Sequence, residues 1–277
     1  MINDEELIKL ALLIKSEEDD ELAKLLEAAG FLFVPVLLKY ILGAEDKLDD
    51  TLQNDYEETW EIVQKLVKRF KNRKPPKAVI SVYLNKRSFK SAMADKVVPE
   101  LRKTFFGLFD EFNAKWSGPE SLDYRTKSYR DIEKWLKGLP KLMDLTTKDA
   151  VAKLVQASYE DGKGIKWLER ELSNLPEFER KRARTTSITE GLRMYSASEY
   201  EAFMQNDSIV GKTLRHTHGI NDPRKGHEAA DGQTVAKDDF FIINGENCRY
   251  PRDPMLSAKE SIHCHCFMEP VLIEETK

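Results

Sequence analysis

From Glu5 to about Phe203, apolar residues recur at intervals of three and four positions, which is the spacing of one face of a helix. Strand-like alternation is rare in this region. After Asn206 the chain becomes richer in Gly, Pro, Asp, Asn and His, and its apolar runs shorten. The sequence therefore predicts an α+β protein, with a mainly helical region at 1–160 and a small domain at 161–277 that contains a short antiparallel sheet.

Proline and glycine divide the helical region into separate elements. The basic segment KNRKPPK at 71–77 predicts the end of one helix, because proline cannot continue a helical ladder. Thr146 and Asp149 have the spacing of a capping box, so a new helix is expected to begin there. The expected helices cover 56–70, 93–108, 129–142, a segment after Thr146, 165–172 and 177–204.

Two strand signals stand out in the C-terminal part of the chain. The run FFII ends at Ile243 and is followed by Asn244-Gly245 and then by Cys248 to Tyr250. Asn-Gly between two short apolar runs predicts a hairpin with a type I′ turn. A further strand is expected at 267–273.

The composition indicates a soluble chain, with 41% hydrophobic and 33% charged residues. Its longest apolar run, Phe31 to Leu42, is interrupted by Pro35 and Lys39 and is shorter than the roughly 18 residues that span a bilayer. We therefore expect a core element there and no membrane partner. The acidic N-terminal segment MINDEELIKL has no feature of a signal peptide, so synthesis in the cytoplasm is expected.

Charge is distributed unevenly along the chain. Residues 1–50 hold 13 acidic and 5 basic side chains, net −8, whereas residues 61–110 hold 4 and 13, net +9. One interpretation is a pair of solvated helical faces, and the other is a surface that docks DNA or an acidic partner. The candidate phosphate contacts are Lys65, Lys68, Arg69, Lys71, Arg73, Lys74, Lys77, Lys86 and Arg87.

All five histidines and all three cysteines lie within residues 216–277, so the candidate chemistry is C-terminal. Cys264 and Cys266 are separated by one residue, and on an extended chain their side chains point to the same face. That arrangement suits a metal ion. The alternative is that both cysteines are small buried residues and that His227 donates a hydrogen bond to a turn at Asp231.

Five motifs follow one another in the last third of the chain. They are Ile188-Thr189-Glu190, Asp222 to His227 (DPRKGH), Asp231-Gly232-Gln233, Tyr250 to Pro254 (YPRDP) and Ile262 to Cys266 (IHCHC). Their order and spacing resemble the phage Mu F protein and SPP1 gene-7-like family of head morphogenesis proteins, over residues 163–272. The chain departs from that family at His263, where Asn is usual, and at His265, where Arg is usual.

The resemblance implies a minor capsid protein of a tailed phage or prophage. Such a protein resides in the virion, at the capsid interior or portal vertex, and in the host cytoplasm during assembly. Its implied partners are portal and capsid proteins and, without sequence preference, DNA.

The resemblance also implies a structural zinc ion. Some family members carry Cys-x-x-Cys where this chain has Arg224 and His227, and those two cysteines with the terminal Cys-x-Cys imply a four-thiolate zinc site. In this chain the expected ligands are His227, Cys248, Cys264 and Cys266. His216, His218, His263 and His265 are alternatives to Cys248.

An enzymatic alternative is a metal-assisted hydrolase or toxin-like nuclease. His227 would act as general base, Asp231 or Glu190 would orient it or hold a metal, and His218 would be a second acid. The sequence has no Gly-rich phosphate loop, no Gly-x-Ser-x-Gly elbow and no His-Glu-x-x-His pair. We therefore expect no catalytic residues, and we expect Glu190 to form an exposed ion pair with a neighbouring arginine.

Overall fold

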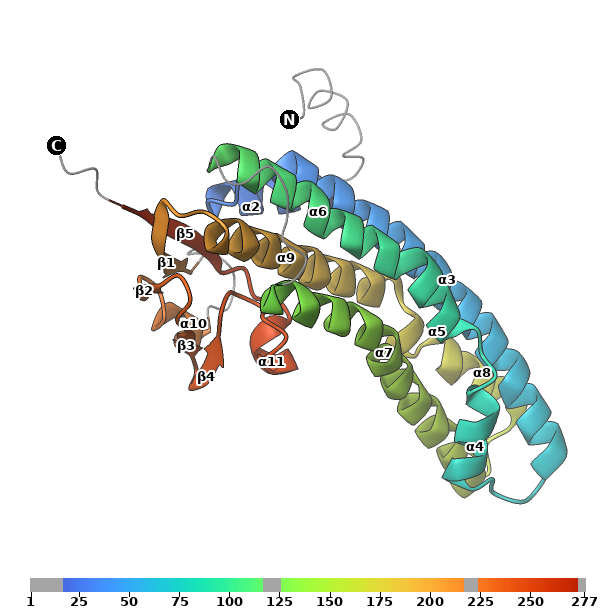
Figure 1. Ribbon diagram of the computed structural model, residues 1–277. Coiled ribbons are helices and arrows are strands. Elements are labelled where there is room, and N and C mark those ends of the chain that lie inside the picture. Colours follow the sequence, from blue (N-terminus) through green and yellow to red (C-terminus); the bar gives the residue numbers. More distant parts are fainter. Residues whose placement is uncertain (1–16, 117–125, 217–223, 274–277) are drawn as a thin grey trace. The chain divides into compact units, whose positions relative to one another are not determined.

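The computed structural model describes residues 17–116, 126–216 and 224–273. Helices extend to Met204 and short strands follow, which confirms the predicted α+β class (Figure 1). The helical elements before the first strand are α2 (Glu17–Ala28), α3 (Val34–Phe70), α4 (Lys77–Leu84), α5 (Phe89–Ala92), the π-helical turn η1 (Met93–Val97), α6 (Val98–Lys115), α7 (Lys127–Glu160), α8 (Ile165–Ser173), the 3-10 turn η2 (Pro176–Phe178) and α9 (Arg180–Met204).

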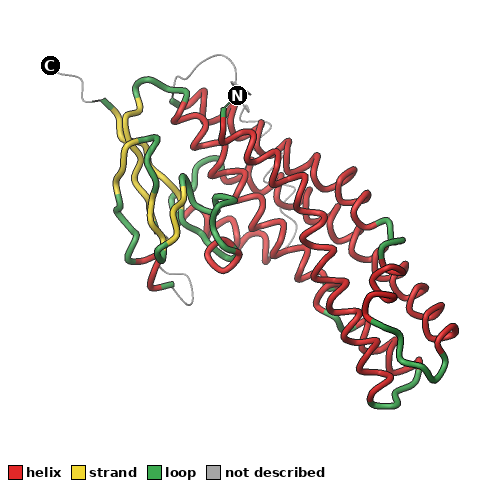
Figure 2. The backbone as a smooth tube through the Cα atoms, turned by 60° about the horizontal axis from the view of Figure 1, so that its bottom comes forward, coloured by secondary structure: helices red, strands yellow, loops and turns green. Residues whose placement is uncertain are grey.

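The C-terminal part contains two small antiparallel sheets (Figure 2). In the first, β1 lies between β2 and β5, and in the second, β3 pairs with β4. Asn244 and Gly245 both have positive φ, 53° and 82°, which confirms the predicted type I′ turn between β3 and β4. The elements of this part are β1 (Ile209–Arg215), α10 (Lys225–Glu228), β2 (Thr234–Ala236), β3 (Phe241–Ile243), β4 (Glu246–Cys248), α11 (Ala258–Ser261) and β5 (Phe267–Leu272).

The chain forms two compact units, each assembled from separate segments. Unit 1 comprises residues 1–44, 100–135 and 186–277, and unit 2 comprises residues 45–99 and 136–185. The division expected near residue 160 falls inside unit 2 and stays a prediction. None of the described helices combines the length and the apolar character needed to cross a membrane.

Helix α3 explains the long apolar run and the proline inside it. Pro35 is the second residue of α3, a position where the missing N–H costs no hydrogen bond. The helix ends at Phe70, directly before KNRKPPK, as predicted. The apolar run at 31–42 therefore belongs, from Val34 onwards, to a core helix.

Helix α7 is continuous where two helices were predicted, so the capping-box prediction is wrong. The hydroxyls of Thr146 and Thr147 both donate to the carbonyl oxygen of Met143, at 2.8 and 3.2 Å. These bonds run back along the same helix and do not cap the start of a new one. The local spacing is overridden by contacts within α7, which also tolerates Pro140 in its interior.

The core of unit 1 is built around α9, whose residues from Thr189 to Phe203 are all buried. The Tyr195 ring contacts Phe31 and Phe112 edge-on, each at 5.0 Å between ring centres. Its hydroxyl accepts a hydrogen bond from the backbone N–H of Leu32 at 2.9 Å. This central tyrosine satisfies its polar group while its ring fills the core.

The core of unit 2 is a separate apolar cluster. Tyr56 packs edge-on against Phe178 at its margin, at 5.6 Å between ring centres. The buried members of the cluster are Ile62, Val63, Leu66, Ile80, Leu84, Val151, Ala152, Val155, Leu168, Leu172 and Phe178.

Beside this cluster, unit 2 buries an arginine between two carboxylates. Arg87 Nη1 donates to both carboxylate oxygens of Asp55 at 2.9 Å, and Nη2 donates to Asp144. The side chains of Arg87 and Asp55 expose 1% and 0% of their surface. Burial raises the pKa of Asp55 to about 7 against the opposing effect of the Arg87 charge. Arg87 was predicted to contact phosphate, but it faces inward and is not part of an exposed basic surface.

Replacing Arg87 with Met should destabilise the protein by about 3–5 kcal/mol, because the buried carboxylate of Asp55 loses its charged partner and that of Asp144 keeps only Lys148 and Lys90. The pKa of Asp55, already raised above its unfolded value, should then rise further. A raised folded-state pKa of an acid means that stability falls as pH rises towards that pKa. The loss measured by urea unfolding should therefore grow above pH 7, where Asp55 is ionised in the unmodified chain but still protonated in the variant. Lys86→Met, at a neighbouring exposed position, is the control, and an equal loss in both variants would contradict the account.

Candidate metal centre

Four candidate ligands from three separate segments meet in unit 1. His227 Nδ1 lies 3.3 Å from Cys266 Sγ and 3.6 Å from Cys264 Sγ. His216 Nδ1 lies 3.5 Å from Cys266 Sγ. One ring nitrogen of each histidine and Cys266 Sγ all lie within 4.8 Å of one another. The structure therefore brings together three predicted ligands, His227, Cys264 and Cys266, and adds His216.

Each candidate ligand occupies a short element or the end of one. His216 directly follows β1, His227 lies in α10, and the two cysteines directly precede β5. Glu260 of α11 accepts a hydrogen bond from His227 Nε2 at 2.9 Å. With the proton on Nε2, the lone pair of Nδ1 faces the two sulfur atoms, which is the tautomer that a metal-binding imidazole needs.

A buried arginine supports the Cys-x-Cys segment. Arg252 Nη1 donates to the carbonyl oxygen of Cys264 at 2.6 Å, and Nη2 donates to that of Cys266 at 2.9 Å. Nη2 also donates to Ser196 Oγ on α9 at 2.6 Å. Arg252 is fully buried, so its guanidinium fixes the backbone of both cysteines against the central helix of unit 1.

The electrostatic environment favours a thiolate at Cys264. A hydrogen bond from Cys266, assisted by His227 and by the charge of Arg252, holds the pKa of the Cys264 thiol well below its usual range. Burial alone would lower the pKa of His227, but its hydrogen bonds with Cys264 and Glu260 raise it, so Nδ1 must lose a proton before it can bind a metal. A centre that stabilises negative sulfur is suited to a cation.

The spacing of the donors fits a tetrahedral zinc ion. Zinc bound by sulfur at about 2.3 Å and by nitrogen at about 2.0–2.1 Å places neighbouring S and N donors about 3.6 Å apart. Three of the four S···N distances, 3.3, 3.5 and 3.6 Å, lie close to that value, while Cys264 is outside the group of donors that all lie within 4.8 Å of one another. Cys266, His227 and Cys264 expose only 0%, 1% and 2% of their surface. Such burial is typical of a structural metal site and leaves a nucleophile without access to substrate.

Cys248, another predicted ligand, lies close enough to Cys264 and Cys266 for their charges to interact with it. Cys248 opposes Phe241 in the β3–β4 hairpin and is fully buried. Burial raises the pKa of its thiol. Burial and the charge of Arg252 lower the pKa of His265 to about 4. His218 and Asp222 fall within 217–223, outside the described residues.

The Asp-Gly-Gln motif connects the centre to both sheets. Asp231 Oδ1 accepts a hydrogen bond from the backbone N–H of His216 at 2.8 Å. Gln233 accepts from the backbone N–H of Ile242 at 2.7 Å and so holds β3. Gly232 has a φ of 74°, a conformation that favours glycine. Through these hydrogen bonds Asp231 and Gln233 hold backbone N–H groups in place. The carboxylate that contacts His227 is that of Glu260.

Glu190, the other carboxylate of the enzymatic alternative, is buried. It accepts hydrogen bonds from Trp135 Nε1 at 2.7 Å and from Arg193 Nε at 3.0 Å. The expected pairing with a neighbouring arginine is therefore present, but the expectation that this pair is exposed is wrong. Burial makes the pair a packing element of α9.

The predicted basic surface is only partly available for phosphate. Lys65, Lys74 and Lys77 face Glu61, Glu160 and Asp149. Arg69 donates to the hydroxyl of Tyr83, whose ring also lies 5.0 Å from the Lys86 ammonium. Among the described contacts, no carboxylate faces the exposed side chains of Lys68, Lys71 and Arg73.

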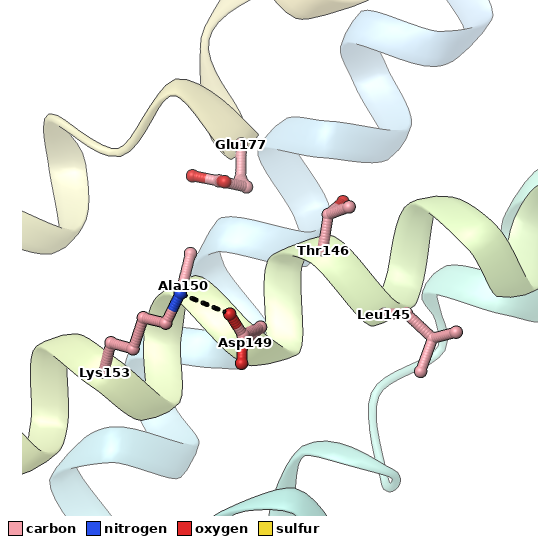
Figure 3. Close-up of a pocket in the computed structure, with 6 residues that line it drawn as sticks. All are labelled: Leu145, Thr146, Asp149, Ala150, Lys153 and Glu177. Carbon is pink, nitrogen blue, oxygen red and sulfur yellow. Dashed lines mark ion pairs between the residues drawn. The ribbon is translucent and has the colours of Figure 1, made fainter. Parts of the chain in front are cut away.

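Unit 2 also has an open hollow of about 430 Å³ on its surface (Figure 3). An ion pair between Lys153 and Asp149, at 2.7 Å, lies at this hollow. The hollow has neither cysteine nor histidine in its lining, so it does not belong to the metal centre. Its lining residues are Leu145, Thr146, Asp149, Ala150, Lys153 and Glu177.

Comparison with known proteins confirms the resemblance seen in the motifs. Residues 149–269 match the family model described as Phage Mu protein F like protein. The chain is also 40% identical, over 144 residues, to the uncharacterized protein YqbB of Bacillus subtilis (strain 168). That match covers 51% of this chain and 47% of the relative, so the chain spans about half the length of the curated relative it matches. No solved structure matches the chain.

Replacing Arg252 with Met should destabilise the protein by about 2–5 kcal/mol, because two buried carbonyl groups lose their donors. Arg224→Met is a matched control, since Arg224 also donates to two backbone carbonyls, those of Lys259 and Ile262, but is only half-buried. The control should lose about 1 kcal/mol. Urea unfolding measures the stability of both variants. Equal losses of stability would contradict the idea that burial of the Arg252 guanidinium makes its hydrogen bonds more stabilising.

Proposed function

We propose that this chain, whose residues 149–269 match the Mu F-like family, is a minor capsid protein that acts in head morphogenesis of a tailed phage or prophage. The family match carries this proposal. The closed Cys/His centre supports it, because three of its donors are buried and suited to holding a domain together. The proposed location is the capsid interior or portal vertex, with assembly in the host cytoplasm.

The proposed protein partners are the portal and capsid proteins. Targeted mass spectrometry of purified, DNA-filled particles tests this assignment, with the copy number scaled to the portal protein. We expect a few copies of the chain in each particle. Finding the chain only free in the lysate would overturn the assignment.

We further propose that the centre holds a structural zinc ion. His227, Cys264 and Cys266 form the core of its ligand set, and bound zinc would link α10 to the segment before β5. Glu260 orients the imidazole of His227, and Arg252 fixes the carbonyls beside the two thiols. These supporting contacts are of the kind that surround protein metal ligands.

Removing the metal should destabilise the protein. With free zinc at about a thousand times its Kd, binding to the folded state contributes about 4 kcal/mol. Urea unfolding with chelator should therefore show a lower midpoint than with zinc, and adding excess zinc should restore it. A midpoint that is the same with chelator and with zinc would contradict a structural metal.

We also propose that the end of α3 and the loop after it contact the phosphates of packaged DNA. Lys68, Lys71 and Arg73 are exposed and have no carboxylate partner among the described contacts. Arg69 and Lys86 flank the ring of Tyr83 and extend the same basic surface. Contacts of this kind neutralise phosphates without reading bases, so binding should depend strongly on salt.

Replacing Lys68, Lys71 and Arg73 with Gln should weaken binding to duplex DNA. The slope of log K against log salt should fall in magnitude by about 3, one for each lost phosphate contact. Fluorescence anisotropy across a salt series measures it. The matched control carries Lys65→Gln, Lys74→Gln and Lys77→Gln, which removes equal charge from side chains that already face carboxylates. Equal effects in both triple variants would contradict the proposed surface.

A further inference from the structure

The donors His227, Cys264 and Cys266 leave a structural zinc site one ligand short. Structural zinc is almost always bound by four protein ligands in tetrahedral geometry. The Cys-x-Cys segment supplies two sulfurs and α10 supplies one nitrogen. A fourth donor must therefore come from a neighbouring segment, and the sequence pattern alone does not identify it.

The geometry points to His216. Its Nδ1 lies 3.5 Å from Cys266 Sγ, which is close to the separation of about 3.6 Å expected for N and S ligands of one zinc ion. His216 and His227 each also place a ring nitrogen within 4.8 Å of the other and of Cys266 Sγ. Neither Cys264 nor Cys248 belongs to this group of three donors, but Cys264 Sγ lies 3.6 Å from His227 Nδ1, whereas Cys248, the fourth ligand expected from the sequence, belongs to the β3–β4 hairpin.

The backbone of His216 is held in place by the Asp-Gly-Gln turn. Asp231 Oδ1 accepts a hydrogen bond from the N–H of His216 at 2.8 Å. Next to this bond, the backbone N–H of Gly232 donates to the carbonyl oxygen of Leu214 at 2.9 Å. The backbone N–H of Leu214 donates to the carbonyl oxygen of Gln233, also at 2.9 Å. These bonds extend the pairing of β1 with β2 up to the histidine. His216 is therefore attached to a paired strand and to a side-chain anchor.

We infer that His216 is the fourth ligand of a Cys2His2 zinc centre with His227, Cys264 and Cys266, and that Asp231 is the residue that positions it. The inference rests on the proposed structural zinc ion and names its complete ligand set. It gives Asp231 a positioning role and leaves Cys248 as a buried thiol of the hairpin. Zinc bound in this way would connect the end of β1, α10 and the start of β5.

The test measures Zn²⁺ and Co²⁺ binding to the full chain by chelator competition, with bound zinc quantified by elemental analysis. His216→Ala should weaken zinc binding at least 100-fold, and Asp231→Ala should weaken it about 10-fold to 100-fold, as expected for a residue that orients a ligand. Cys248→Ala is the matched control and should bind one zinc with the affinity of the unmodified chain. Circular dichroism establishes whether each variant is folded.

A second variant keeps the test decisive if His216→Ala does not fold. His216→Cys retains a ligand atom, so it should bind Co²⁺ with a stronger sulfur-to-metal absorption band than the unmodified chain, because three thiolates would replace two. An unchanged cobalt spectrum would overturn the inference. Loss of zinc in Cys248→Ala with full binding in His216→Ala would also overturn it, while the zinc proposal would stand. No metal binding by the unmodified chain would overturn the zinc proposal itself.

Discussion

The C-terminal part of unit 1 depends on a guanidinium that is removed from water. Burying a charged arginine costs several kcal/mol unless its donors are satisfied. The two terminal nitrogens of Arg252 donate to the carbonyl oxygens of Cys264 and Cys266 and to Ser196 on α9, while its Nε has no hydrogen-bond partner among the described residues. The same contacts fix the Cys-x-Cys segment, so the two thiols are held before any metal binds.

Several polar contacts converge on this segment. Glu260 accepts hydrogen bonds from His227 and from Asn244 in the hairpin turn, while Asp231 accepts one from His216. Gly226 lies so close to the Asn244 side chain that a Cβ atom there would clash with it. The family motifs therefore have a physical explanation in this chain, because their polar side chains connect loops that contain little regular secondary structure.

Local signals in the sequence predicted much of the fold. Proline residues set the end of α3, and Asn-Gly set the hairpin turn. The failures came from contacts that residue spacing alone does not reveal. The separation of α7 into two helices was wrong because Thr146 and Thr147 bond within one helix. Strand β1 was not predicted, because it buries a lysine, Lys212. The Lys212 ammonium donates to the carbonyl oxygen of Arg249 and lies 4.5 Å from the ring centre of Tyr200. The clustering of Cys and His indicated a metal, yet only the structure placed His216 beside Cys266.

We propose that these side chains form a closed zinc centre of two thiolates and two imidazoles. X-ray absorption spectroscopy at the zinc edge, on the purified full chain, tests it most directly. We expect two sulfur neighbours at about 2.3 Å and two imidazole nitrogens at about 2.0 Å. A shell of three sulfurs and one nitrogen would restore Cys248 as a ligand, and a shell of oxygen atoms alone would contradict the centre altogether.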